Sequence, residues 1–200
     1  MRYKLFIVVI FISFTINIFS QVQFTSHMIT TDANGARSVY AIDLDSDGDM
    51  DVLSASSKDN KIAWYENDGN ENFFPHSIST VADYTTSVYA VDLDGDGDVD
   101  VISAAGDGAF PKGEITWYEN DGDERFTSHI IATDARSATS VYAEDIDGDG
   151  DMDVISASGG WKTIVWYENN GNKNFTPHAI TTFMFDAISI YTEDVDGDND

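Results

Sequence analysis

The sequence of 200 residues contains 36 acidic and 10 basic residues, which gives a formal net charge of -26 at pH 7. Such acidity excludes nucleic acid as a natural partner and matches anionic membrane surfaces poorly, whereas it suits cations. Hydrophobic residues make up 42% of the chain, enough for a folded core, and there is no cysteine, so disulfides cannot stabilise an exported form.

Residues 1–20 have the features of a secretory signal peptide. Arg2 and Lys4 precede an uncharged, largely apolar run, and small Ser20 ends the segment. A membrane anchor is the alternative, but polar residues interrupt the run and leave it shorter than the ~20 apolar residues that a span requires. We therefore expect cleavage after Ser20 and a secreted or cell-surface chain, residues 21–200, without membrane contact. Loss of Arg2 and Lys4 takes the net charge from -26 to -28.

The most informative feature of the remaining chain is an acidic nonapeptide that occurs four times, beginning at residues 43, 92, 145 and 194. A full copy has aspartate at positions 1, 3, 5, 7 and 9 and glycine at position 6. Alternate residues of a tight turn can point inward together, and Ca²⁺ takes roughly six to eight oxygens at about 2.3–2.6 Å. Without an ion, two carboxylates ~5 Å apart repel by about 3 kcal/mol at an effective dielectric near 20. The spacing therefore predicts structural calcium sites rather than solvated acidic turns.

The candidate metal ligands are Asp43, Asp45, Asp47, Asp49, Asp51, Asp92, Asp94, Asp96, Asp98, Asp100, Asp145, Asp147, Asp149, Asp151, Asp153, Asp194, Asp196 and Asp198. A helix-loop-helix site is excluded because position 12 holds serine in the three full copies, where a bidentate glutamate is needed. Position 9 must then complete the shell. At position 7 we expect the backbone carbonyl to ligate and the carboxylate to face water.

The fourth copy differs from the others. Asn199 replaces the glycine, and the sequence stops at Asp200, before the ninth position. Asparagine tolerates the left-handed backbone better than other non-glycine residues, so we expect weaker binding there. We also expect the sequence to be part of a longer protein.

The chain repeats with a period of about 50 residues. Its four histidines, His27, His76, His129 and His178, are separated by 49, 53 and 49 residues. The second unit reads as four short β-strands, at residues 87–94, 99–105, 114–120 and 125–133. Turn dipeptides between the third and fourth strands, at Asp68-Gly69, Asp121-Gly122 and Asn170-Gly171, suit a tight hairpin.

Four antiparallel strands in each repeat are typical of a propeller blade. We predict an all-β fold of four-stranded antiparallel β-propeller blades that form a partial ring. The residues suffice for one opening strand, three full blades and the first strand of another. The acidic loops join the first two strands of each blade.

The acidic loops and the repeat length resemble the FG-GAP-like, or VCBS, repeats of secreted bacterial proteins, which are related to the propeller of integrin alpha subunits. The resemblance covers residues 21–200 and rests on the D-x-D-x-D-G-x-x-D loop. It implies that this loop binds calcium between the first two strands of each blade, and that the repeats form a propeller, commonly of seven blades. Carried over to this chain, it assigns Ca²⁺ to the aspartates named above.

The histidines and the WYEN phrases repeat with the unit. A transition-metal site shared by the histidines is disfavoured because each lies on a separate blade without a second ligand at suitable spacing. We expect each histidine, and the phenylalanine before it, to pack against a neighbouring blade from the fourth strand. The WYEN aromatics, which include Trp64, Trp117 and Trp166, are predicted to fill the inter-blade core. A carbohydrate platform is the alternative for them.

For catalysis the sequence offers little. It has no cysteine nucleophile, no G-x-S-x-G elbow and no phosphate-binding loop, and its paired carboxylates are assigned to calcium. We expect a calcium-binding module for binding or adhesion that is not an enzyme. The alternative is the propeller part of a secreted polysaccharide-degrading lyase or hydrolase, which a catalytic domain beyond residue 200 would reveal.

The two rims of the predicted blades differ. Calcium loops and ENDG-type turns repeat uniformly on one rim, whereas the loops of the other rim vary, as at residues 56–61 and 106–113. Varied loops on a rigid scaffold are where recognition usually occurs. We predict that Trp161, Phe110 and Tyr84 form a contact surface for a glycan or a cell-surface protein on this second rim. Packing against a neighbouring blade is the alternative for Trp161.

Overall fold

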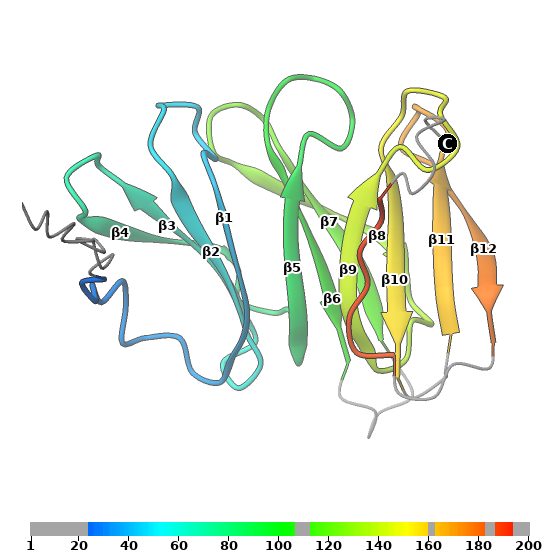
Figure 1. Cartoon of the computed structure of the whole chain (residues 1–200), viewed down its shortest axis with the longest axis horizontal. Helices are drawn as coiled ribbons and strands as arrows, with labels where there is room; N and C mark the ends of the chain where they lie inside the picture. Colours follow the sequence, from blue (N-terminus) through cyan, green and yellow to red (C-terminus); the bar gives the residue numbers. More distant parts are fainter. Residues whose placement is uncertain (1–23, 107–112, 160–162, 183–186, 194–200) are drawn as a thin grey trace, which may run out of the picture.

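The computed structural model describes residues 24–106, 113–159, 163–182 and 187–193, and these residues are all-β (Figure 1). In them, twelve strands form three four-stranded antiparallel sheets, and strands adjacent in sequence are adjacent in each sheet. The strands are β1 (Ala36–Ile42), β2 (Asp51–Ser56), β3 (Lys61–Asn67), β4 (Phe73–Ser79), β5 (Thr85–Val91), β6 (Asp100–Ala105), β7 (Glu114–Asn120), β8 (Phe126–Ala132), β9 (Ala138–Glu144), β10 (Asp153–Ser158), β11 (Thr163–Asn169) and β12 (Phe175–Thr181). Within the described residues there is no helix that could cross a membrane.

The sheets correspond to the predicted repeat units, so we name them blade 1 (β1–β4), blade 2 (β5–β8) and blade 3 (β9–β12). The predicted all-β fold of four-stranded antiparallel blades is confirmed, and the described blades form an open arc rather than a closed ring. The first strands, β1, β5 and β9, stand side by side (Figure 1). The later strands of each sheet spread away from this line, which is the arrangement of propeller blades.

Two local predictions were wrong. The first strand of blade 2 ends at Val91 rather than at residue 94, because the backbone turns at Asp92 and reaches positive φ at Gly95 and Gly97. The turn between the third and fourth strands is also not a tight hairpin. In blade 2 it takes the five residues 121–125, closed by a hydrogen bond from the Asp121 N–H to the Arg125 carbonyl (3.2 Å).

The predicted opening strand and the first strand of a fourth blade do not appear as paired strands. Residues 24–30 form no ladder, and neither do residues 187–193. Residues 187–193 nevertheless run beside β9, where the Ile190 N–H donates to Ser140 Oγ (3.2 Å) (Figure 1). A β-strand requires a neighbouring strand with which to share backbone hydrogen bonds. Within the described residues, neither segment has a neighbour that pairs with it along its length.

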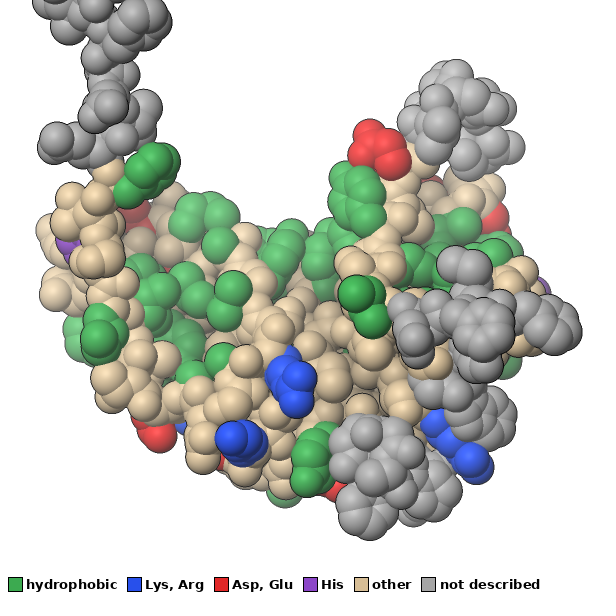
Figure 2. All heavy atoms as spheres, turned by 60° about the horizontal axis from the view of Figure 1, so that its bottom comes forward, with side chains coloured by type: hydrophobic (Ala, Val, Ile, Leu, Met, Phe, Trp, Pro, Cys, Tyr) green, Lys and Arg blue, Asp and Glu red, His purple; other side chains and the backbone are tan. Residues whose placement is uncertain are grey.

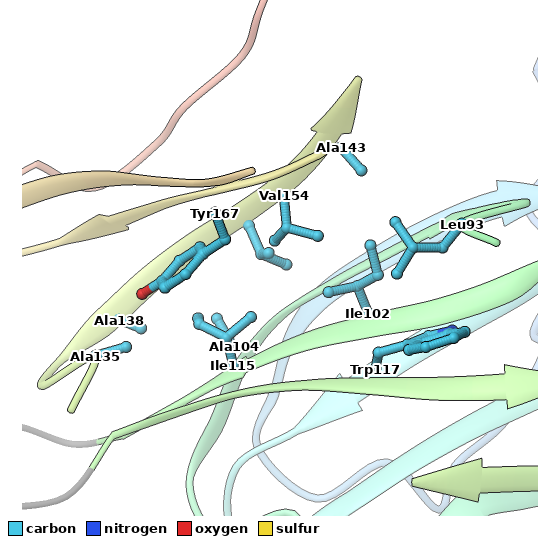
Figure 3. Packing of buried hydrophobic residues seen from close by; sticks show 11 residues of the cluster. Leu93, Ile102, Ala104, Ile115, Trp117, Ala135, Ala138, Ala143, Val154 and Tyr167 are labelled. Atoms are coloured by element: carbon cyan, nitrogen blue, oxygen red, sulfur yellow. The ribbon is translucent and has the colours of Figure 1, made fainter. Parts of the chain in front are cut away.

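The hydrophobic core lies between the blades. Blade 1 places Leu53, Ile62 and Trp64 against a face of blade 2, and blade 2 packs against blade 3 in the same way. Figure 3 shows this second contact, in which Ile102, Ile115 and Trp117 of blade 2 face Val154 and Tyr167 of blade 3. The second strands are packed on both faces and are therefore almost entirely buried. The prediction that WYEN aromatics fill the inter-blade core is confirmed for Trp64 and Trp117.

A row of tyrosine rings, tilted against one another, runs along β1, β5, β9 and the segment beside β9. Tyr40, Tyr89, Tyr142 and Tyr191 follow one another with ring centroids 4.8, 4.5 and 5.0 Å apart. Burial, together with the hydroxyl groups of its two neighbours, raises the pKa of Tyr89. The row therefore adds an uncharged contact between successive blades at physiological pH.

The free face of blade 1 is exposed. Val39 is 70% exposed, whereas the equivalent Val88 and Val141 are each 4% exposed because a preceding blade covers them. At the outer edge of blades 1 and 3, Pro75 and Pro177 lie in the fourth strands, where a missing N–H costs no ladder bond and hinders pairing with another chain.

Candidate metal centre

Three of the four acidic nonapeptides lie within the described residues. We call them loop 1 (residues 43–51), loop 2 (residues 92–100) and loop 3 (residues 145–153), and each joins the first strand of its blade to the second, as predicted. They emerge on one rim, at the upper end of β5 and β9 in Figure 1. Asp194, Asp196 and Asp198 of the fourth copy lie outside the described residues, as do the predicted signal peptide, Phe110 and Trp161.

The aspartates at positions 1, 3 and 5 converge in loops 2 and 3. Carboxylate oxygens of Asp92, Asp94 and Asp96 lie within 4.8 Å of one another, and so do those of Asp145, Asp147 and Asp149. In loop 1 the corresponding group is Asp43, Asp45 and Asp51, which brings in position 9 instead of position 5. The loops therefore gather hard oxygen donors at the separation that a single cation can bridge.

The position 1 aspartate also shapes the loop. Its Oδ2 accepts a hydrogen bond from the glycine N–H at position 6, at 3.0 Å in all three loops. These glycines, Gly48, Gly97 and Gly150, have φ between 98° and 99°, a backbone conformation that side chains rarely allow. Glycine at position 6 thus lets the chain turn back and direct its N–H at the first ligand.

Two observations test whether a cation suits this geometry. Asp43 Oδ1 and Asp94 Oδ1 are buried and have no hydrogen-bond partner, which is costly for a carboxylate oxygen unless something positive lies against it. Burial raises the pKa of Asp45, and the charges of Asp51, Asp47 and Asp43 raise it further. The donors are carboxylates throughout, the ligand type that calcium and magnesium prefer. The residues present therefore fit a hard divalent cation.

The position 9 aspartate has a role that the sequence did not indicate. Asp51, Asp100 and Asp153 are fully buried. In each, Oδ2 accepts the N–H at position 2 of the loop at 3.0–3.2 Å, and Oδ1 accepts the N–H of the last residue of the third strand at 2.7–2.8 Å. Burial raises the pKa of Asp100 to about 7 despite these donors. This carboxylate joins the loop to the third strand whether or not it also contacts an ion.

Sequence reasoning missed a second residue type, the asparagine that ends each WYEN phrase. Asn120 donates its backbone N–H to Asp100 and its Nδ2–H to the Val99 carbonyl, while its Oδ1 accepts the N–H of Gly122. Asn67 and Asn169 make the same three bonds in their blades. The residue thus fastens the acidic loop to the neighbouring turn. Its presence in all three WYEN phrases was the available signal.

The prediction that the position 7 carboxylates face water is only partly right, because each also packs against a neighbouring turn. Asp49, Asp98 and Asp151 are half-buried and lie against the glycine of the turn between the third and fourth strands. A Cβ at Gly122 would stand 2.6 Å from Asp98 Oδ2, and at Gly171 2.5 Å from Asp151 Oδ2. The two turns on this rim are therefore packed together, and a side chain at the turn glycine would have to displace the carboxylate.

The histidines pack within their own blade, not against a neighbouring one. Trp117 and His129 are cross-strand partners with ring centroids 4.7 Å apart, and His129 Nε2 lies 2.7 Å from Glu119 Oε2. Blades 1 and 3 repeat this with His76 on Trp64 and His178 on Trp166. The register of the third and fourth strands, not the contact between blades, sets the position of each ring.

One lysine reaches this rim from a neighbouring blade. Lys173, in the turn between β11 and β12, lies 2.6 Å from Glu119 Oε1 and 3.1 Å from Asp94 Oδ2 of blade 2. These two hydrogen bonds raise the pKa of Lys173, and the bond from Lys173 lowers the pKa of Glu119. The ammonium therefore stays charged beside a candidate metal ligand.

The three repeats match a known family of protein repeats. Residues 43–103, 100–156 and 145–200 each match the family model described as FG-GAP-like repeat. No curated protein matches the chain.

Two solved structures share part of the fold at low identity. One is an Agrocybe aegerita lectin, described as specifically recognising non-reducing terminal N-acetylglucosamine, with a TM-score of 0.49 and 17% identity over 72% of this chain and 39% of that one. The other is a luciferin-regenerating enzyme, with a TM-score of 0.42 and 15% identity over 68% of this chain and 44% of that one. The chain spans less than half the length of either protein, and the likeness carries no functional argument.

Proposed function

Since the chain belongs to the FG-GAP-like repeat family, we propose that it is a secreted or cell-surface calcium-binding β-propeller module that serves in binding or adhesion. In this proposal calcium has a structural task, which is to hold the loop between the first two strands of each blade. The observation that carries it is the convergence of three carboxylates in each described loop, with buried oxygens that lack any partner in loops 1 and 2.

Within each loop, the different positions have different roles. The aspartates at positions 1, 3 and 5 of loops 2 and 3, and at positions 1, 3 and 9 of loop 1, would hold the ion, which supplies the positive charge that cancels their mutual repulsion. The glycine at position 6 permits the turn, and the position 9 aspartate anchors the loop to the third strand through backbone N–H groups. Because the position 7 carboxylate lies against the neighbouring turn, the loop and that turn are held as one unit.

Calcium binding is tested directly by isothermal titration calorimetry of the calcium-free chain. We expect at least one ion for each described loop. Asp92→Asn together with Asp94→Asn should remove one ion from the stoichiometry. Asp83→Asn, a single-charge change at an exposed site away from the loops, is the control and should leave the stoichiometry unchanged. A chain that takes up no calcium at millimolar concentration refutes the proposal.

The binding surface is proposed on the rim away from the acidic loops. Tyr84 lies there, 41% exposed, with its N–H donating to Asn60 Oδ1 (3.3 Å) and its carbonyl accepting the Gly106 N–H (3.1 Å). An aromatic ring on a backbone fixed in this way can be buried by a partner at little entropic cost. Figure 2 turns this rim toward the viewer and shows lysine, arginine and scattered apolar side chains on it.

The proposed partner is a glycan or a cell-surface protein, bound through Tyr84 with Trp161 and Phe110. A glycan array probed with the calcium-loaded chain is the first test. Alanine at Tyr84, Trp161 and Phe110 should abolish a signal that the chain gives, with the free energy of unfolding lowered by no more than about 1 kcal/mol, as for surface sites. Lower stability with unchanged binding would assign these aromatics to packing.

The alternative, the propeller part of a polysaccharide-degrading enzyme, has less support. The carboxylates that a lyase or hydrolase would use are gathered in loops 1, 2 and 3, where backbone N–H groups hold them. We therefore rank a non-catalytic module first.

A further inference from the structure

Loop 2 receives a cationic side chain from the next blade. Lys173 Nζ lies 3.1 Å from Asp94 Oδ2 and 2.6 Å from Glu119 Oε1, and it stands 5.4 Å from the centre of the Trp117 ring. The ammonium is thus held by two carboxylates and an aromatic face of blade 2, although its own backbone belongs to blade 3.

The contact between Lys173 and Asp94 lies in a partly enclosed part of the interface between blades 2 and 3. A cleft of about 270 Å³ lies between blades 2 and 3, lined by loop 2, Trp117 and Lys173 among others. The Asp94 side chain is only 11% exposed, so its attraction to the ammonium is screened less than at an open surface. Blade 3 makes a second contact with this loop, because Asn169 Nδ2 donates to the Leu93 carbonyl (3.3 Å).

The repeats differ at the lysine position. Lys173 is the fourth residue of its five-residue turn and has a left-handed backbone (φ 61°). The same place in blades 1 and 2 is taken by Glu71 and Glu124, with φ of 64° and 59°. Lys173 belongs to blade 3 and reaches loop 2 of the preceding blade. Glu124 holds the same position in blade 2, whose preceding blade carries loop 1. At this repeat position, blade 2 therefore carries a negative charge where blade 3 carries a positive one.

We infer that Lys173 competes with calcium for Asp94 and so lowers the calcium affinity of loop 2 relative to loop 1. This inference rests on the proposed calcium function. In the calcium-free chain the ammonium offsets the carboxylate charge of loop 2 and ties blade 3 to it. A divalent cation on the same aspartate is repelled by the ammonium, so binding must weaken or displace the Lys173 contact. The loops of one propeller would then fill at different calcium concentrations.

Glycine amides can report each loop separately, because Gly48, Gly97 and Gly150 each donate to the first ligand of their own loop. Calcium titrations of the ¹⁵N-glycine-labelled chain at low ionic strength should be followed by NMR. In K173Q the midpoint of the Gly97 amide should fall roughly 5- to 10-fold, within the range of known couplings between sites. The midpoints of Gly48 and Gly150 should stay within about twofold, an experimental margin that distinguishes a local from a general effect.

Three further variants serve as controls. K61Q removes the same charge from the start of β3, where Lys61 pairs with Asp32 and Asp59, and should move none of the midpoints. K173R keeps the charge and should behave as the unchanged chain does. E124K places a cation beside loop 1 and should raise the Gly48 midpoint. Added salt should shrink the effects of K173Q and E124K.

The outcomes separate this inference from the proposed function. If the amides respond to calcium but the Gly97 midpoint in K173Q is unchanged or higher, the competition is refuted and calcium binding stands. If no amide responds in any protein, the calcium function fails and the inference fails with it. Should K173Q not fold without calcium, chelator titration from the calcium-loaded state yields the same midpoints.

Discussion

Replacing Asp100 by asparagine tests the structural role of the ninth loop position. The buried carboxylate accepts the Leu93 N–H at 3.1 Å and the Asn120 N–H at 2.8 Å. An amide of the same size can accept only one of them and turns its NH₂ group toward the other. One buried N–H is then left without an acceptor, which costs about 1–3 kcal/mol. At a pH of about 4.5, where the raised pKa of Asp100 keeps the folded-state carboxyl uncharged, Asp100→Asn should lower the free energy of unfolding by this amount even where calcium is scarce.

Asp94→Asn is the matched control. It makes the same substitution in the same loop but takes no acceptor from a buried backbone N–H. Asp94 Oδ1 has no hydrogen-bond partner, and Oδ2 pairs with the half-exposed Lys173. At low calcium its cost should stay below ~1 kcal/mol, because Lys173 keeps its shorter contact with Glu119. Urea unfolding followed by tryptophan fluorescence at a pH of about 4.5, over a series of free calcium concentrations, separates the two variants. Equal losses at the lowest calcium concentration would refute the reasoning.

Three further predictions follow from the fold. Gly122→Ala should destabilise the chain by roughly 1–3 kcal/mol more than Gly95→Ala, because only Gly122 faces the Asp98 carboxylate, although both have positive φ; equal losses in thermal unfolding would contradict this. Burial raises the folded-state pKa of Asp100 to about 7, above the ~3.9 of an unfolded chain, so the calcium-free protein should lose stability as the pH rises from about 4 to 7. Asp100→Asn should reduce that slope in urea unfolding, and an unaltered slope would count against the assignment. The exposed face around Val39 should drive self-association, which light scattering would detect and Val39→Asp should reduce, whereas a monodisperse chain would show that the face is harmless.

Local features of the sequence were enough to predict the blades and the positions of the acidic loops. Alternating β-branched residues set the strands, and each acidic loop carries its own turn chemistry within nine residues. Trp64 and Trp117 were correctly assigned to the inter-blade core because large aromatics in a repeated strand have few other places to pack.

The errors arose where the answer depended on turn length or on distant partners. The turn at residues 121–125 is longer than a two-residue hairpin, and its length fixes the register that brings His129 onto Trp117. Position 9 was interpreted only as a ligand, since its hydrogen bond to residue 120 joins segments 20 residues apart. The sequence shows that Lys173 replaces a glutamate, but only the structure shows that it meets Asp94 on another blade.

The central claim is that calcium holds the loops of the blades, and thermal unfolding with and without calcium tests it most directly. At a free calcium concentration 100 times the dissociation constant, each site adds about 2.7 kcal/mol, so the three described loops together add about 8 kcal/mol. That is comparable with the ~5–15 kcal/mol stability of a whole domain. Replacing calcium by EDTA should therefore lower the Tm by roughly 15–30 °C, and returning excess calcium should restore it. An unchanged melting curve in EDTA would contradict the account.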